Sequence, residues 1–155
     1  MTNCEVIAMN IAIVDDEPVF LKQLHNRLRE MKLPDCEIHE FTSGRDLLSF
    51  YVKGMYEVII LDVEMPDLTG LQTAERIRQI DGSVIISFLT NYAEFAVKGY
   101  DVGAFRYILK NQPDYVYTKQ LNSIIAECQQ RFRTFTFNNN CLLYTSPSPR
   151  DVEES

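Results

Sequence analysis

Five short apolar runs alternate along the chain with longer stretches whose apolar residues recur every three or four positions. Three runs, residues 11–14, 58–61 and 84–89, are almost continuously apolar, which is typical of parallel strands covered on both faces. Residues 37–41 and 105–109 instead alternate apolar and polar side chains, as half-exposed strands at a sheet edge do. The pattern predicts five strands separated by helices.

Capping residues and one proline mark the ends of the helices. Ser43 with Asp46, and Thr69 with Gln72, have the spacing of a capping box, and Pro34 ends the first helix. The expected apolar helix faces are Phe20, Leu21, Leu24, Leu28 and Met31; Leu47, Leu48 and Tyr51; Leu71, Ala74 and Ile77; residues 95–97; and Leu121, Ile124, Ile125, Cys128 and Phe132.

Strands joined by right-handed helical crossovers form an open parallel sheet with helices on both faces. With the alternating strands at its edges, the order that fits best is 2-1-3-4-5. The sequence thus predicts an α/β fold, a doubly wound (βα)5 three-layer sandwich of the flavodoxin-like type. A ligand site is expected at the carboxyl ends of strands one and three, where the winding of this fold reverses.

Carboxylates follow both of these strands. Asp15 and Asp16 come directly after the first strand, and Asp62 comes directly after the third. An acidic residue here is often only a helix N-cap, and Asp16 or Glu17 before Pro18 has that alternative explanation. Three clustered carboxylates, however, repel one another unless a cation lies among them. Hard oxygen ligands of this kind predict a Mg²⁺ site.

The fourth and fifth strands bring a hydroxyl group and an ammonium group to the same edge. Thr90 ends one strand and Lys110 follows the other. Each has an ordinary explanation, because Thr favours strands and a single Lys is usually solvated. Together with Asp62 as nucleophile and a magnesium ion, they are the groups that aspartyl-phosphate chemistry requires.

The sequence resembles the receiver domain of two-component response regulators from about residue 10 to residue 133, and we expect this domain to cover residues 9–133. The resemblance implies a signalling switch rather than an enzyme, which catalyses only its own phosphorylation and dephosphorylation. Four segments carry it: 13–18, 61–70, 88–90 and 103–110.

The resemblance also implies roles for the clustered carboxylates. Asp62 would be the phosphoacceptor, taking a phosphoryl group from the phosphohistidine of a sensor histidine kinase. Asp15 and Asp16 would hold Mg²⁺ together with Asp62 and the backbone carbonyl of Glu64. Magnesium is therefore the expected cofactor, and the kinase is the expected partner.

The resemblance also implies a switch formed by Thr90 and Tyr107, with Lys110 beside the phosphoryl group. Thr90 would hydrogen-bond the phosphoryl group, and Lys110 would pair with its charge. Tyr107 matches the switch aromatic of the family, which turns inward when the Thr hydroxyl moves; a plain edge-strand aromatic is the alternative. The surface formed by the fourth helix, fifth strand and fifth helix would then change, and a homodimer through this surface is one expectation.

Some residues depart from the family pattern. Asn111 stands where a cis proline usually follows the lysine, so this bond is either trans or strained. Asn91 replaces a small residue, while Glu64 and Tyr92 occupy positions that tune the phosphate lifetime. One alternative is a receiver-shaped module that takes no phosphate and acts by constitutive protein contacts. Another is a haloacid-dehalogenase-like phosphatase, although that class has a second Asp where Glu64 stands.

Composition excludes several other classes of protein. The 155 residues are 46% hydrophobic and 24% charged, as in a globular domain rather than a disordered one. A net charge of −7 argues against nucleic-acid binding by the chain as a whole. No apolar run approaches the roughly 20 residues of a membrane span. We therefore expect no membrane contact. The four cysteines are scattered without a CxxC pair, which favours idle thiols in a reducing cytoplasm.

The residues after the predicted receiver resemble a further domain. Segments 88–97 and 101–107 resemble receivers attached to LytTR-type DNA-binding domains, and residues 131–137 alternate aromatic and polar side chains as a new strand would. We expect residues 134–140 to begin such an output domain, truncated here; a polar tail is the alternative. DNA contact is expected only through the missing part of that domain.

The two ends of the chain are expected not to belong to these domains. Met9 directly precedes the first strand, so residues 1–8 are expected to be an upstream extension. Residues 141–155 are expected to be a non-native tail. The eleven residues 141–151 can be encoded by the transposase adapter sequence used in short-read library preparation, which resembles no protein family.

Overall fold

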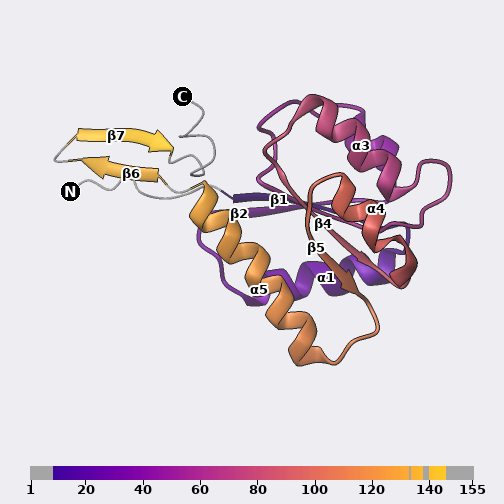
Figure 1. Cartoon of the computed structure of the whole chain (residues 1–155). Helices are drawn as coiled ribbons and strands as arrows, with labels where there is room; N and C mark the ends of the chain where they lie inside the picture. The colour runs from indigo at the N-terminus through magenta and orange to yellow at the C-terminus, as the bar shows by residue number, and fades with distance from the viewer. Residues whose placement is uncertain (1–8, 133, 138–139, 146–155) are drawn as a thin grey trace.

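The five predicted strands form one parallel sheet flanked by helices (Figure 1). The computed structural model describes residues 9–132, 134–137 and 140–145. Its elements are β1 Met9–Val14, α1 Pro18–Glu30, β2 Cys36–Phe41, α2 Gly44–Leu48, β3 Val58–Leu61, α3 Gly70–Ile80, β4 Ile85–Thr90, the 3-10 helix η1 Ala93–Phe95, α4 Ala96–Asp101, β5 Ala104–Leu109, α5 Asp114–Arg131, β6 Thr134–Phe137 and β7 Asn140–Thr145.

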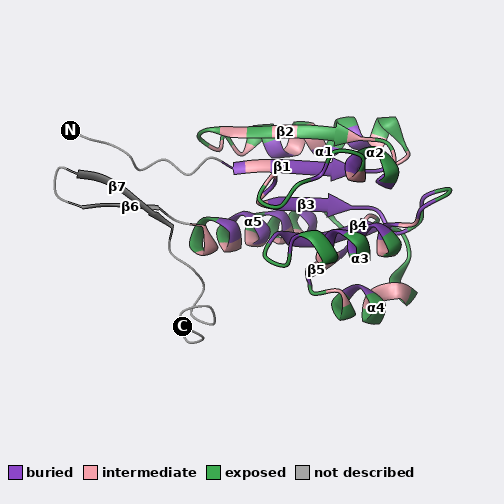
Figure 2. Cartoon of the chain, turned by 90° about the horizontal axis from the view of Figure 1, so that it is seen from above, coloured by how far each residue is buried: buried purple, intermediate pink, exposed green. Residues whose placement is uncertain are grey.

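The strand order is β2-β1-β3-β4-β5, and each neighbouring pair is parallel. The predicted α/β, doubly wound fold with order 2-1-3-4-5 is therefore confirmed. β3 and β4 are buried along their whole length, whereas β2 at the edge has exposed residues (Figure 2). Helices cover both faces of the central strands, which explains why their sequences are continuously apolar.

The sheet separates two hydrophobic cores. Ile60 lies in one core with Leu24 of α1 and Ile124 of α5. Its neighbour Ile59 lies in the other core with Ile77 of α3. Adjacent strand residues point to opposite faces of a sheet, so one short apolar strand supplies both cores. None of the described helices is both long and apolar enough to cross a membrane.

The second helix is shorter than its apolar pattern predicts. α2 ends at Leu48, so Tyr51 lies beyond it rather than on its apolar face. The Tyr51 hydroxyl donates a 3.0 Å hydrogen bond to the Asp81 carboxylate, and the Gly54 N–H donates another of 3.0 Å to the same oxygen. These long-range bonds fix the loop after α2 in place of a further helical turn.

The two predicted capping boxes differ. At α3, Thr69 and Gln72 exchange both hydrogen bonds of the box. At α2, Ser43 accepts from the Asp46 N–H at 3.1 Å, but within the described part of the chain the Asp46 side chain makes no bond back to Ser43. An Asp side chain is one methylene shorter than the Glu or Gln usual at this position.

A separate antiparallel pair follows α5. β6 lies where the alternating pattern predicted a new strand, and its partner β7 includes residues 141–145, for which no element was predicted. Residues 1–8 and the prolines at 147 and 149 lie outside the described residues, as do the expectations attached to them.

Candidate functional site

The three predicted carboxylates meet at the carboxyl edge of the sheet. Asp15 follows β1 and Asp62 follows β3, and these strands are paired. The Asp62 N–H donates to the Val14 carbonyl at 3.0 Å, which extends the ladder by one residue and fixes where Asp62 begins. Carboxylate oxygens of Asp15, Asp16 and Asp62 all lie within 4.8 Å of one another. The structure therefore brings together the residues that the sequence singled out.

Lys110 lies between two of these carboxylates. Its ammonium nitrogen is 2.7 Å from Asp15 Oδ2 and 3.4 Å from Asp62 Oδ2. The Glu17 carboxylate makes a longer contact of 3.5 Å, and the ammonium lies 4.1 Å from the centre of the Phe20 ring. Sequence reasoning missed Phe20, which it assigned to the apolar face of the first helix. The available signal was its place in the first turn after the acidic pair.

Burial of these groups sets their acidity. Burial raises the pKa of Asp15 to about 6, although the hydrogen bond from Lys110 opposes it. Burial also raises the pKa of Asp62, against the charge of Lys110 and the hydroxyl of Thr90. Burial of Lys110 favours its neutral form, but the hydrogen bond to Asp15 and the charge of Asp62 outweigh this and raise its pKa. The single positive charge of Lys110 therefore does not fully compensate the negative charges of Asp15 and Asp62.

The donor set suits Mg²⁺. Carboxylate oxygens are hard ligands, and two ligands on opposite sides of one Mg²⁺ lie roughly 4 Å apart. The 4.8 Å span of the cluster needs only a small rotation of the carboxylates to reach this distance. Asp15 and Asp62 are buried, whereas Asp16 is the more exposed of the three, which leaves a side open to the waters that Mg²⁺ retains.

The backbone of Tyr92 connects two of the predicted switch residues. Thr90 is buried, and its hydroxyl oxygen accepts from the Tyr92 N–H at 3.4 Å. The Tyr107 hydroxyl donates to the carbonyl of the same Tyr92. The Tyr107 ring packs 5.9 Å from that of Phe88, and a Cβ at Gly99 of α4 would lie 3.0 Å from the ring. Thr90, Tyr107 and α4 therefore form one packed unit.

Gly70 holds the loop after β3 against the site. A Cβ at this position would lie 1.9 Å from the Asp62 carbonyl oxygen, and the Gly70 N–H donates to the Val63 carbonyl at 2.7 Å. The Glu64 N–H donates to Asp62 Oδ1 at 3.4 Å. Only a residue without a side chain lets α3 begin this close to Asp62. The sequence included Gly70 in a resembling segment but gave it no role.

At Asn111, which stands where the family usually has a cis proline, the structure answers whether the preceding bond is cis or trans. The described chain has no cis peptide bond, so the bond between Lys110 and Asn111 is trans. The Lys110 N–H donates to the Thr90 carbonyl at 2.8 Å, which extends the β4–β5 ladder up to the lysine. The ladder therefore positions Lys110 without a cis bond after it.

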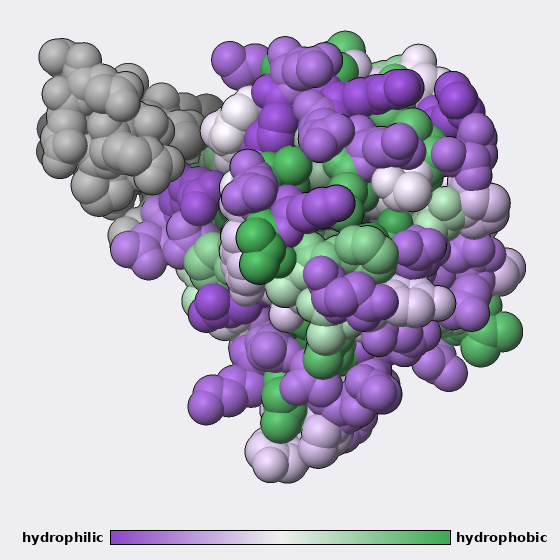
Figure 3. All heavy atoms as spheres, turned by 45° about the vertical axis from the view of Figure 1, so that its right-hand side comes forward, coloured by the Kyte–Doolittle hydropathy of each residue, from purple (hydrophilic) through white to green (hydrophobic). Residues whose placement is uncertain are grey.

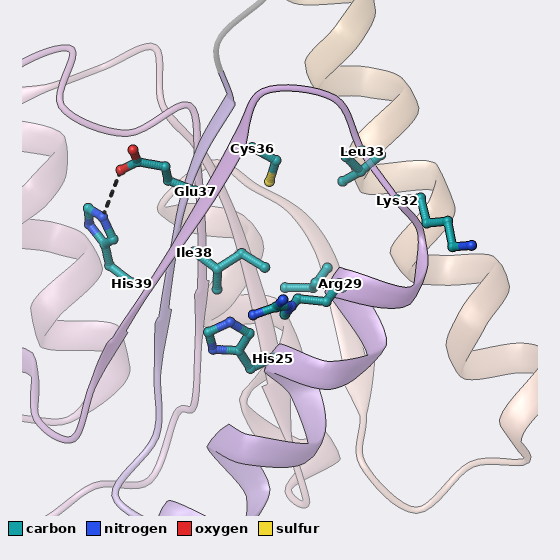
Figure 4. Close-up of a pocket in the computed structure, with 9 residues that line it drawn as sticks. His25, Arg29, Lys32, Leu33, Cys36, Glu37, Ile38 and His39 are labelled. Atoms are coloured by element: carbon teal, nitrogen blue, oxygen red, sulfur yellow. Dashed lines mark hydrogen bonds and ion pairs between the residues drawn. The ribbon is translucent and has the colours of Figure 1, made fainter.

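A separate pocket of about 520 Å³ lies between α1 and β2 (Figure 4). His25 and Arg29 of α1 and Cys36 and His39 of β2 line it, and His39 Nε2 lies 3.2 Å from the Glu37 carboxylate. The pocket lies where α1 ends and β2 begins, at the sheet edge opposite the carboxylates. None of the predicted site residues lines it.

The curated proteins that this chain resembles include regulatory and sensory transduction proteins. The chain is 31% identical over 123 residues to the transcriptional regulatory protein YpdB of Escherichia coli, covering 79% of this chain and 50% of that protein. It is 33% identical over 102 residues to the sensory transduction protein LytR of Staphylococcus saprophyticus, covering 66% of this chain and 40% of that one. The chain thus spans about half the length of the curated relatives it matches.

Solved structures agree with the fold. The response regulatory domain of protein mrkE from Klebsiella pneumoniae matches with a TM-score of 0.69 and 28% identity, over 79% of this chain and all of that one. The response regulator protein TrrA from Thermotoga maritima, solved in complex with Mg(2+)-BeF, matches with a TM-score of 0.64 and 28% identity, over 75% of this chain and 98% of that one.

Receiver domains are signalling switches that bind Mg²⁺ at an acidic pocket, partner with histidine kinases and form dimers. The described structure has such an acidic cluster at the expected sheet edge. The family description that matches is the response regulator receiver domain, over residues 11–122. The chain belongs to the response regulator receiver family.

Proposed function

We propose that Asp62 accepts a phosphoryl group from the phosphohistidine of a sensor histidine kinase, in a reaction that requires Mg²⁺. The carboxylate oxygen of Asp62 forms a bond to phosphorus while the bond between phosphorus and the histidine nitrogen breaks. The observation that carries this proposal is the cluster of the buried Asp15 and Asp62 with the more exposed Asp16, with Lys110 between the two buried carboxylates. Magnesium, when bound, neutralises the oxygens of the phosphoryl group.

The residues around Asp62 have distinct proposed roles. Asp15 and Asp16, with Asp62 and the backbone carbonyl of Glu64, hold the metal. Lys110 exchanges part of its contact with Asp15 for the new phosphoryl oxygens, which offer more negative charge. Because this ammonium starts 3.4 Å from Asp62 Oδ2, the exchange needs little movement.

We propose that phosphorylation is transmitted through Thr90 and Tyr107. When the Thr90 hydroxyl turns to a phosphoryl oxygen, its bond to the Tyr92 N–H is weakened, and the Tyr92 carbonyl also holds the Tyr107 hydroxyl. The surface of α4, β5 and α5 then changes. Val97, Tyr100 and Tyr115 of this surface are 74%, 51% and 76% exposed, which supports a homodimer through it.

We infer that the parent protein acts on DNA through a LytTR-type output domain that begins at about residues 134–140. The alternation of aromatic and polar residues in β6 and the greater length of the relatives support this. The net negative charge is then a property of the receiver, and the output domain is the part that contacts DNA.

One experiment tests the central step. The protein is incubated with acetyl phosphate and Mg²⁺, and its intact mass is measured. One acid-stable, base-labile phosphoryl adduct is expected on the wild type and on Asp101→Ala, which removes an exposed carboxylate. None is expected on Asp62→Ala or in the presence of EDTA.

Three outcomes would contradict the proposal. An undiminished adduct on Asp62→Ala would place the phosphoacceptor elsewhere, and no adduct on the wild type would indicate a module that acts without phosphate. Turnover of added phosphate esters would indicate a phosphatase instead.

A further inference from the structure

A groove lies between α3 and α4, next to the loop that carries Glu64. It has a volume of about 560 Å³. Its apolar lining consists of Val63, Leu71, Phe95 and Val102, and the last three are half-buried members at the margin of one core. α3 and α4, at the right of Figure 1, come forward in Figure 3, where apolar patches lie among strongly hydrophilic side chains.

The rim of this groove is acidic. Glu64, Glu75 and Asp101 carry three negative charges, and Lys98 carries one positive charge. All four side chains are exposed. Within residues 9–132, none of these four side chains lies within 4 Å of an oppositely charged group. The rim therefore has negative charge that the receiver itself leaves unneutralised.

The groove is long enough for a short helix. A second hollow shares Glu75, Asp101 and Val102 with it and continues along α3 to Gln79. From Leu71 to Gln79 the axis of α3 rises about 12 Å, which is roughly two helical turns.

Arg78 lines the second hollow and holds its wall by hydrogen bonds to the backbone. Its guanidinium donates to the carbonyls of Val84, Val102 and Gly103 at 2.7, 2.9 and 3.1 Å. These acceptors are neutral carbonyls, so Arg78 keeps its charge, but none of these three bonds goes to a carboxylate of the rim.

We propose that this groove binds a short, basic amphipathic helix of a partner protein. Apolar side chains of such a helix would pack against Leu71, Phe95 and Val102, and its Lys or Arg residues would pair with Glu75 and Asp101. An apolar stripe with charges on either side is the usual recognition mode of a helix in a groove. DNA and acidic peptides are repelled by the same carboxylates. None of the residues that line the groove is the phosphoacceptor, so the proposal is tested on the unphosphorylated protein.

The test is a titration of the isotope-labelled protein followed by amide chemical shifts. The probe is a synthetic helical peptide of about 14 residues, with leucines on one face and lysines on the other. A second peptide has the same composition in an order that breaks the apolar stripe. Saturable shifts are expected at Leu71, Glu75 and Asp101 with the first peptide, and at least about tenfold weaker binding is expected with the second.

Matched charge reversals separate this groove from general attraction to an acidic protein. Glu75→Lys is expected to weaken binding about fivefold. Glu30→Lys makes the same charge change at an exposed position of α1 and is expected to change binding less than twofold. The same spectra report whether each variant is folded.

Three outcomes would overturn the proposal: shifts spread over other faces, equal binding of the two peptides, or equal loss in the two variants. Concentration-dependent shifts at these residues without peptide would identify a second copy of the chain as the occupant, and would also overturn it.

Discussion

At the scale of single residues, the site depends on a position that has no side chain. Gly70→Ala would place a methyl group 1.9 Å from the Asp62 carbonyl oxygen, and backbone atoms cannot move aside as a flexible side chain can. We expect a loss of about 3 kcal/mol in the free energy of unfolding, together with slower phosphorylation by acetyl phosphate. Chemical denaturation and intact mass measure the two effects.

Gly82→Ala is the matched control, because nothing lies within 4 Å of a Cβ at that position. It is expected to be neutral or to gain up to about 1 kcal/mol, since alanine reduces the freedom of the unfolded chain. Equal losses in the two variants would contradict the close approach at Gly70.

Lys110 gives a second prediction at this scale. Lys110→Met keeps an apolar chain near Phe20 but removes the ammonium between Asp15 and Asp62. Without metal, we expect a loss of about 3 kcal/mol at pH 7, because two buried carboxylates lose their cation. Saturating Mg²⁺ should recover much of this loss by neutralising the same carboxylates. Thermal unfolding with Mg²⁺ or with EDTA measures it, and a loss that Mg²⁺ leaves unchanged would contradict the account.

At the scale of elements, one buried carboxylate joins the loop after α2 to the loop after α3. Burial favours the neutral form of Asp81, but hydrogen bonds from the Gly54 N–H, the Tyr51 hydroxyl and Ser83 outweigh it and hold the pKa of Asp81 below its ordinary value. A carboxyl whose pKa is lowered by folding stabilises the protein above its unfolded pKa of about 4. That contribution is lost as the pH falls through the folded value.

Asp81→Asn is therefore expected to cost about 2 kcal/mol at pH 7 and less at pH 3, because below the unfolded pKa the stabilisation by the charged carboxyl is already being lost. Urea unfolding of both proteins at the two pH values measures this difference. A difference that stays constant between pH 7 and pH 3 would show that the charge of Asp81 is not what stabilises the two loops.

At the scale of the whole molecule, the sheet carries a change at its carboxyl edge to the surface of α4, β5 and α5. If phosphorylation exposes a self-complementary form of this surface, acetyl phosphate with Mg²⁺ should double the mass seen by sedimentation. Val97→Asp should prevent this, because it places a charge at the centre of an apolar contact. Val52→Asp changes another exposed valine, 58% accessible, and should leave the dimer intact. Equal effects of the two variants would contradict this interface.

The sequence alone determined the fold and the chemical types at the site. Strands covered on both faces must be apolar throughout, so the continuous runs at β1, β3 and β4 identified the centre of the sheet, and alternation identified β2 and β5 as its edges. Because parallel strands end at one edge, the residues that follow β1, β3, β4 and β5 had to converge. Asp15, Asp62 and Lys110 could therefore be expected together.

Which atoms touch one another depends on the packing of the whole domain. Lys110 bonds to Asp15, 95 residues earlier, and stacks over Phe20, a residue whose spacing also fits an ordinary core position. The link from Thr90 to Tyr107 runs through the backbone of Tyr92, and backbone groups are the same in every residue, so no pattern marks them. The end of α2 is likewise set by the bond from Tyr51 to Asp81, 30 residues later, and the need for a glycine at position 70 comes from the close approach of the Asp62 backbone. Periodicity records which face of an element is buried, whereas the contacts at its ends depend on how the loops pack.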